Sequence, residues 1–436
     1  MTQDKQIFLK TFYQSLADRP LDPDDRWYAP LYAINGGQPD PVVELRRRIE
    51  WAVTLETAQL FSGFRGTGKS TELRRLQHLL EESGVYKVLR CDMQDYLNLY
   101  TPIDISDFLI AIAGAFSEKL KEPDYLGKDP SHENYWERLS NFFKRTNVEL
   151  SELSVTKDIV GLQANLTQDP SFKKRLQEEM KGHIGALAAD VRSYLESCVK
   201  KLKEVHGDDT QVVLLLDSIE QIRGTSVNEN EVYASVETVF QGHADKLRLP
   251  YIHVVYTVPP WLKIRAPGVA GLYTNSEHLP CVKVRQPDGT PNLEGVTALE
   301  NLISKRGDWQ RLFGSQAALH RVILDSGGYL RDLLRLLQRC LSQAAGRDLP
   351  IDEETIDMAE HHIRNEYLPI AVKDAEWLSR VAATHRAALI EGGDLGHLSR
   401  FFDTHLILCY RNGREWYDVH PLIADHVREL AQQRPV

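Results

Sequence analysis

A glycine-rich stretch at residues 60–73, LFSGFRGTGKSTEL, strongly restricts the folds that this chain can adopt. Residues 63–70 match the pattern G-x-x-x-x-G-K-[ST], in which backbone N–H groups of a loop surround phosphate oxygens. Apolar residues precede the loop, as at the end of a strand, and leucines follow it at helical spacing. The stretch therefore predicts a strand, a phosphate-binding loop and a helix whose N-terminus favours anions.

The residue types in this loop predict a nucleotide with a metal ion. Lys69 is expected to reach the β- and γ-phosphates, and the Ser70 hydroxyl is expected to ligate Mg²⁺. We therefore expect ATP or ADP with Mg²⁺ as cofactors. The predicted nucleotide-binding residues of the loop are Gly63, Arg65, Gly66, Thr67, Gly68, Lys69, Ser70 and Thr71.

Net charge, cysteine content and hydropathy limit the functions and cellular locations that we expect for this chain. The net charge of −10 argues against broad binding to nucleic acid, which needs a basic face, although a local basic patch stays open. The five cysteines are far apart in the sequence and are expected to be reduced, buried thiols. No signal peptide and no apolar run of membrane-spanning length is recognisable, so we expect a cytoplasmic protein without a membrane partner.

Apolar runs alternating with helical patterns predict an α/β fold. The predicted strands are residues 85–91, 212–216, 251–256 and a short one at 282–284. Continuous apolar runs such as VVLLL at 212–216 are typical of parallel strands buried on both faces. Strands of this kind, following a phosphate loop and separated by helices, predict a P-loop ATPase core with a parallel sheet in a doubly wound arrangement.

Four domains are predicted along the chain. They are an N-terminal segment (1–39), the core (40–290), a helical lid (291–350) and a winged-helix domain (351–436). Residues 123–206 are expected to be an insertion in the core, with a β-hairpin at 148–166 and a long helical pattern at 171–205. An amphipathic helix is expected at 104–121. The last domain shows three helical patterns and a hairpin turning at Asn412-Gly413.

Catalytic residues are predicted at the ends of two strands. Asp217 ends the run VVLLLD and is expected to hold Mg²⁺. Ser218 follows it and cannot act as a base, so Glu220 is the candidate for positioning the attacking water, with a helix-capping or surface role as the alternative. Thr257 ends the next strand and is the candidate sensor of the γ-phosphate, or else a strand-terminal hydroxyl bound to the backbone.

Arginines and histidines are considered as phosphate sensors, arginine fingers and metal ligands. Arg331 begins a helix after Gly327-Gly328 and is the candidate second sensor of phosphate, with a solvated charge as the alternative. Arg265 and Arg285 are candidates for an arginine finger, and neither is assigned. The fifteen histidines show no metal-ligand spacing, so no metal other than Mg²⁺ is expected.

Together these segments resemble the AAA+/STAND class of P-loop ATPases. The matching segments are GFRGTGKST, LLLDSIE, Thr257, the GGYLR helix and a winged helix after it. The arrangement is similar both to origin-recognition initiators and to NLR-like signalling ATPases. Glu220, three residues after Asp217, suits the STAND pattern, whereas Arg331 suits the initiators. Residues 416–423, WYDVHPLI, resemble the STAND Met-His-Asp motif with Pro421 in place of Asp.

This resemblance implies a slow ATPase that works as a molecular switch. The histidine matching His420 faces the ADP β-phosphate in STAND proteins, so His420 is expected to bind nucleotide. The resemblance also implies a separate effector or sensor protein as partner, assembly of a homo-oligomer with nucleotide, and a role in bacterial antiphage signalling. One alternative is a DNA-binding initiator or transposition-type loader, favoured by Arg411 and Arg414 but opposed by the acidic total. Another is a non-hydrolysing nucleotide-binding scaffold, which Ser218 keeps open.

Overall fold

The computed structural model describes residues 2–32, 39–130, 134–146, 148, 159–389 and 394–432. The chain divides into two compact units. The sheet unit comprises Val42–Ser62 and Arg75–His278. The loop unit comprises Met1–Pro41, Gly63–Arg74 and Leu279–Val436. Among the described helices, none combines the length and the apolar character needed to cross a membrane.

A five-stranded sheet in the order β2-β3-β4-β1-β5 is the centre of the sheet unit. The strands are β1 (Thr57–Gly63), β2 (Tyr86–Asp92), β3 (Gln211–Asp217), β4 (Ile252–Val258) and β5 (Asn275–Leu279). β2 pairs with β3, β3 with β4 and β4 with β1, and all three pairs are parallel. Every residue of β1 and β4 is buried, as expected for central parallel strands. The predicted α/β class with a parallel sheet is confirmed.

The strand predicted at 282–284 is wrong, because β5 ends at Leu279. The apolar residues that follow β5 hydrogen-bond to distant segments of the loop unit. The Cys281 amide donates to the Cys409 carbonyl (2.9 Å), and the Val282 amide donates to the Gly328 carbonyl (3.1 Å). The apolar residues of 282–284 are buried against other elements and, among the described residues, have no neighbouring strand. Their apolar pattern is nevertheless the same as that of a buried strand.

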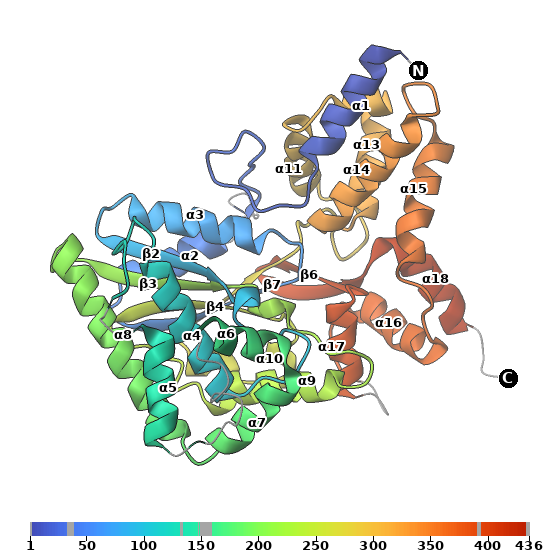
Figure 1. Cartoon of the computed structure of the whole chain (residues 1–436). Coiled ribbons are helices and arrows are strands. Elements are labelled where there is room, and N and C mark those ends of the chain that lie inside the picture. Colours follow the sequence, from blue (N-terminus) through green and yellow to red (C-terminus); the bar gives the residue numbers. More distant parts are fainter. Residues whose placement is uncertain are drawn as a thin grey trace. The chain divides into compact units, whose positions relative to one another are not determined.

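Helices cover the sheet, and several differ from prediction. α4 (Ile105–Leu120) begins at a capping box made by Asp104, but it is buried on nearly all sides where an amphipathic helix was expected. α4, α5 (Tyr135–Arg145) and α8 (Ile184–His206) lie on one side of the sheet (Figure 1). The other helices of this unit are α2 (Pro41–Glu50), α6 (Ile159–Gln168), α7 (Pro170–Met180), α9 (Glu229–Glu237) and α10 (Leu262–Arg265).

One prediction in the insertion is corrected. The hairpin expected at 148–166 is wrong over its second half, where α6 forms and packs beside α5 and α7; residues 149–158 lie outside the described residues. The helical pattern at 171–205 forms two helices, α7 and α8, separated by a turn at Lys181, Gly182 and His183. Glycine is a poor helix former, so a break at Gly182 is reasonable.

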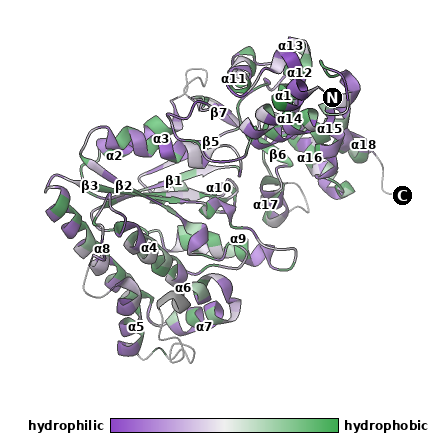
Figure 2. Cartoon of the chain, turned by 45° about the horizontal axis from the view of Figure 1, so that its top comes forward, coloured by the Kyte–Doolittle hydropathy of each residue, from purple (hydrophilic) through white to green (hydrophobic). Residues whose placement is uncertain are grey.

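The loop unit is mostly helical, and its helices carry both hydrophilic and hydrophobic residues (Figure 2). Its helices are α1 (Gln3–Ser15), the start of α3 (Lys69–Glu81), α11 (Leu293–Ser304), α12 (Trp309–Phe313), α13 (Gln316–Asp325), α14 (Leu330–Ala344), α15 (Glu353–Asn365), α16 (Val372–Thr384), α17 (Leu395–Asp403) and α18 (Pro421–Gln432). After residue 350 the described chain has four helices, where three had been predicted.

A two-stranded hairpin lies between α17 and α18. β6 (Ile407–Asn412) pairs antiparallel with β7 (Arg414–Val419). Gly413 makes the turn with φ of +86°, a left-handed conformation that glycine adopts without steric cost. The rings of Tyr410 and Trp416 stack across the strands, with centroids 4.4 Å apart. The predicted hairpin is therefore present, with its turn at the predicted Asn412-Gly413.

Candidate nucleotide-binding site

The phosphate loop follows β1 and ends where α3 begins at Lys69. Gly66 and Gly68 have φ values of +88° and +95°, which side chains other than hydrogen rarely allow. The Thr67 hydroxyl donates to the Phe64 carbonyl (2.8 Å) and closes the turn. The glycines of the motif are thus needed for the path of the backbone.

The Lys69 side chain is folded into this loop. It is 3% exposed, and its Nζ donates to the carbonyls of Gly63 (2.9 Å) and Phe64 (2.7 Å). An ammonium group held there places a positive charge within the loop. The predicted role of Lys69 as a phosphate ligand is compatible with this position.

An N-terminal segment covers the loop and the first turn of α3. The buried Tyr32 hydroxyl donates to the Thr67 carbonyl (2.7 Å), and burial raises its pKa well above the usual value. The Leu21 amide donates to the Thr71 hydroxyl (3.1 Å). Asp22 accepts two hydrogen bonds of 2.9 Å from Arg74. Residues 21–32 therefore hold the loop region from outside the motif.

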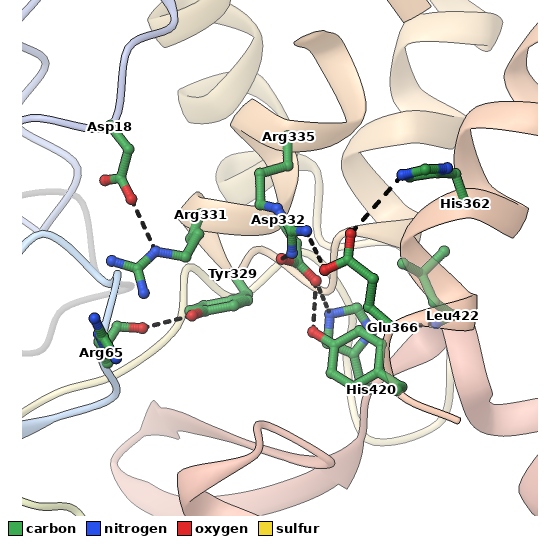
Figure 3. Close-up of polar contacts among 11 residues, drawn as sticks. Asp18, Arg65, Tyr329, Arg331, Asp332, Arg335, His362, Glu366, His420 and Leu422 are labelled. Atoms are coloured by element: carbon green, nitrogen blue, oxygen red, sulfur yellow. Dashed lines mark hydrogen bonds and ion pairs between the residues drawn. The ribbon is translucent and has the colours of Figure 1, made fainter. Parts of the chain in front are cut away.

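The start of α14 contacts the loop directly (Figure 3). The Tyr329 hydroxyl donates to the Arg65 carbonyl at 2.5 Å. A Cβ placed on Gly66 would lie 2.8 Å from the Arg331 Nε, so the loop backbone and this side chain touch. The Arg331 Nε also donates to Asp18 at 2.9 Å. Arg331 thus lies at the phosphate loop, as a phosphate sensor would, and is bound to a carboxylate of its own chain.

Aromatic rings connect the loop to the C-terminal helices and hairpin. Phe64 stacks on Phe402 of α17, with centroids 5.7 Å apart and planes at 8°. His405, which is in the left-handed conformation, lies 5.8 Å from Phe64 and stacks on Tyr329 at 4.8 Å. Burial lowers the pKa of His405 to about 3, so this ring is neutral at pH 7. Phe64 is therefore fixed by residues more than three hundred positions away in the chain.

His420 is fully buried beside Asp332 (Figure 3). Its Nδ1 accepts from the Leu422 amide (3.3 Å), and its Nε2 lies 3.3 Å from the Asp332 carboxylate. Tyr367 donates to the same carboxylate at 2.5 Å. Burial acts to raise the pKa of Asp332, but the bond and charge of His420, helped by Tyr367, hold it at about 2. The structure thus joins His420 to α14 one residue beyond Arg331.

The predicted acids lie at the carboxyl edge of the sheet. Asp217 ends β3, is 2% exposed and accepts from the Ser218 amide (2.8 Å). Glu220 lies in the short turn Ile219–Gln221 and is also buried. The Thr257 hydroxyl accepts from the Ile219 amide (3.0 Å) and donates to the Leu216 carbonyl (3.1 Å). Thr257 therefore connects β4 to the turn that carries Glu220.

A phosphate loop after one strand and a buried acid at the end of another, in a sheet of parallel strands, decide the fold. It is a P-loop NTPase fold. In this fold the carboxyl ends of the strands carry the ligand-binding residues. Ser70 and Asp217 offer the hard oxygen ligands that Mg²⁺ prefers. Within the described residues, no group of three or more His, Cys, Asp or Glu side chains is arranged to hold a metal.

The two candidate arginine fingers both contact acids of their own chain. Arg265 lies 3.3 Å from Glu237 and over the Tyr233 ring. Arg285 lies 3.5 Å from Asp325. Each would have to leave an ion pair before it could act on the phosphate of a neighbouring molecule.

Some residues at these sites were missed by sequence reasoning. Asp92 ends β2 in register with Asp217, and Gln94 connects the two strand ends by donating to the Ser218 hydroxyl (3.1 Å). The sequence CDMQD after an apolar run was an available signal for Asp92. Asp18, Tyr329 and Phe402 had no such signal, because only the tertiary fold brings them to the loop.

Comparison with models of known protein families and with curated proteins finds no match. Solved structures of similar architecture include the Walker-type ATPase of Pyrococcus abyssi, at 13% identity, covering 95% of this chain and 99% of that one, with a TM-score of 0.42. The ORC2 protein of Aeropyrum pernix in its ADP form is 11% identical, covers 96% of each chain and has a TM-score of 0.43. Cdc6p of Pyrobaculum aerophilum is 14% identical, covering 93% and 97%, with a TM-score of 0.37.

Proposed function

We propose that the chain is an ATP-binding, slowly hydrolysing molecular switch of the AAA+/STAND type. The observation that carries this proposal is the set of contacts on the phosphate loop. Tyr32, Tyr329 and Phe402 come from three distant parts of the chain and all touch the loop. A nucleotide that reshapes the loop would therefore change the packing of the helical lid (291–350) and the winged helix (351–436). By analogy with NLR-like ATPases, the switch acts on a separate partner protein in bacterial antiphage signalling.

Each site residue has a role in this proposal. Lys69 and the loop amides bind phosphates, while Ser70 and Asp217 hold Mg²⁺. Glu220 positions the water, and Thr257 acts by fixing the turn that carries Glu220. Arg331 senses phosphate from the lid. His420 acts through Asp332, to which it is bound.

Nucleotide binding is the first test. Lys69→Ala should abolish binding of ATP–Mg²⁺, because the loop loses its only lysine. In the wild type, ATP at a hundredfold above its dissociation constant should stabilise the fold by about 2.7 kcal/mol, seen as a thermal shift. If ATP did not change the melting temperature of the wild type, the proposal would be refuted.

Retention of ADP tests the role of His420. His420→Ala removes one partner of Asp332, which also accepts from Tyr367, and should loosen α14 beside Arg331. The variant should purify with less bound ADP and assemble more readily without added ATP. His426→Ala, in the same helix region, is the control. Wild-type ADP content in His420→Ala would show that the winged helix does not hold the nucleotide through this residue.

A DNA-binding initiator is the second candidate, because Arg411 and Arg414 lie on neighbouring strands near the tip of the hairpin. Two arginines neutralise few phosphates, so duplex binding by the switch should be weak and lost at physiological salt. In addition, α17, the helix before the hairpin, is packed on the loop through Phe402. Tight, salt-resistant binding that is removed by Arg411→Ala with Arg414→Ala would favour the initiator.

A further inference from the structure

The contact between Asp18 and Arg331 lies where a nucleotide phosphate would be sensed (Figure 3). Arg331 donates from Nε to the Asp18 carboxylate at 2.9 Å. The same Nε is as close as 2.8 Å to the position that a Cβ on Gly66 would take. One guanidinium group is therefore in contact with both the phosphate loop and a carboxylate of the N-terminal segment.

This ion pair is accessible, and the segment that carries it is held by other bonds. The Asp18 side chain is 58% exposed and that of Arg331 is 27% exposed. On either side of Asp18, the Leu16 carbonyl accepts from Gln338 (3.1 Å) and the Leu21 amide donates to Thr71 (3.1 Å). An exposed pair of this kind contributes little to stability, so an incoming anion could replace Asp18 without unfolding the segment.

Carboxylate and phosphate oxygens are alternative partners for the same guanidinium donors. We propose that Asp18 competes with nucleotide phosphates for Arg331 and thereby lowers the affinity of the loop for nucleotide. Asp18 is then a positioning residue that acts by holding the Arg331 guanidinium group and has no contact of its own with the nucleotide. This inference rests on the proposed nucleotide-binding function. It adds that a residue outside the phosphate-loop motif regulates the affinity for nucleotide.

The test is a titration of the full chain with fluorescent ATP and ADP in the presence of Mg²⁺. Asp18→Asn keeps the size of the side chain and removes its charge, so nucleotide affinity should rise about two- to fivefold. The gain should shrink as salt is raised, because the pair is exposed. Arg331→Gln should weaken binding, and Asp18→Asn added to Arg331→Gln should change nothing further.

Asp22→Asn is the matched control. Asp22 lies in the same segment and pairs with Arg74, away from Arg331. If Asp18→Asn acted only by loosening the segment, Asp22→Asn would tighten binding equally, and the inference would be wrong. Unchanged affinity in Asp18→Asn would also overturn it. If neither the wild type nor Asp18→Asn binds nucleotide, the proposed function itself fails and this inference fails with it; binding by Asp18→Asn alone would support both.

Discussion

His405 shows how one buried side chain makes stability depend on pH. Burial lowers its pKa to about 3, whereas an unfolded histidine has a pKa near 6.5. The unfolded state therefore binds the extra proton first, so this group removes stability as the pH falls below about 6.5, by up to about 1.4 kcal/mol per pH unit. His253, whose pKa burial lowers to about 4, acts in the same direction.

We expect His405→Asn to reduce this pH dependence, since asparagine tolerates the left-handed conformation of the site and does not titrate. Urea unfolding at pH 7, 6 and 5 measures it. Below pH 6.5, the slope of the unfolding free energy against pH should be smaller in the variant by about 1.4 kcal/mol per pH unit, which corresponds to about one proton. This difference in slope is expected whatever stability the variant loses at pH 7. His361→Asn, on an exposed position of α15, is the control. An unaltered slope in His405→Asn would show that the ring is protonated in the folded protein.

At the scale of elements, the start of α14 is predicted to hold the phosphate loop. Tyr329→Phe keeps the ring on His405 but loses the hydrogen bond to the Arg65 carbonyl. We expect the free energy of unfolding to fall by about 1 kcal/mol and hydrogen exchange of the loop amides to become faster. Tyr410→Phe loses a comparable buried bond, to the Gly327 carbonyl, and should leave loop exchange as in the wild type. Equal exchange in both variants would contradict the role of Tyr329.

Elements with a strong local pattern were predictable from sequence, and those shaped by tertiary contacts were not. The loop glycines and the apolar run before Asp217 fix the core strands by themselves. By contrast, the apolar residues of 282–284 are buried beside Gly328, and α6 forms beside α5 and α7 within a segment that alternates like a strand. The motif residues of the candidate site could be proposed from sequence for the same reason, whereas Asp18 and Phe402 depend on contacts across more than three hundred residues.

For the whole molecule, hydrolysis should depend on assembly. Ser218 replaces a base beside Asp217, and Arg265 and Arg285 are each held in an ion pair of their own chain. The isolated protein should therefore turn over slowly, and an arginine supplied by a neighbour contributes on the order of 10³–10⁵ in other phosphoryl transferases. We expect the rate per molecule to rise with protein concentration or with a partner, as measured by phosphate release. A fast rate independent of concentration would refute this, and an unaffected rate in Glu220→Gln would remove that residue from the mechanism.

The contacts of Phe64 and Thr67 also restrict how such a gene can recombine. A crossover that exchanged residues 40–290 as one cassette would transplant the phosphate-binding motif without the aromatic side chains that touch it, Tyr32, Tyr329 and Phe402. The recombinant protein would then contain the whole phosphate-loop motif but lack the aromatic side chains that pack on the loop. Diversification of this lineage should therefore proceed through the insertion, while the segments that carry Tyr32, Tyr329 and Phe402 are inherited together with the motif.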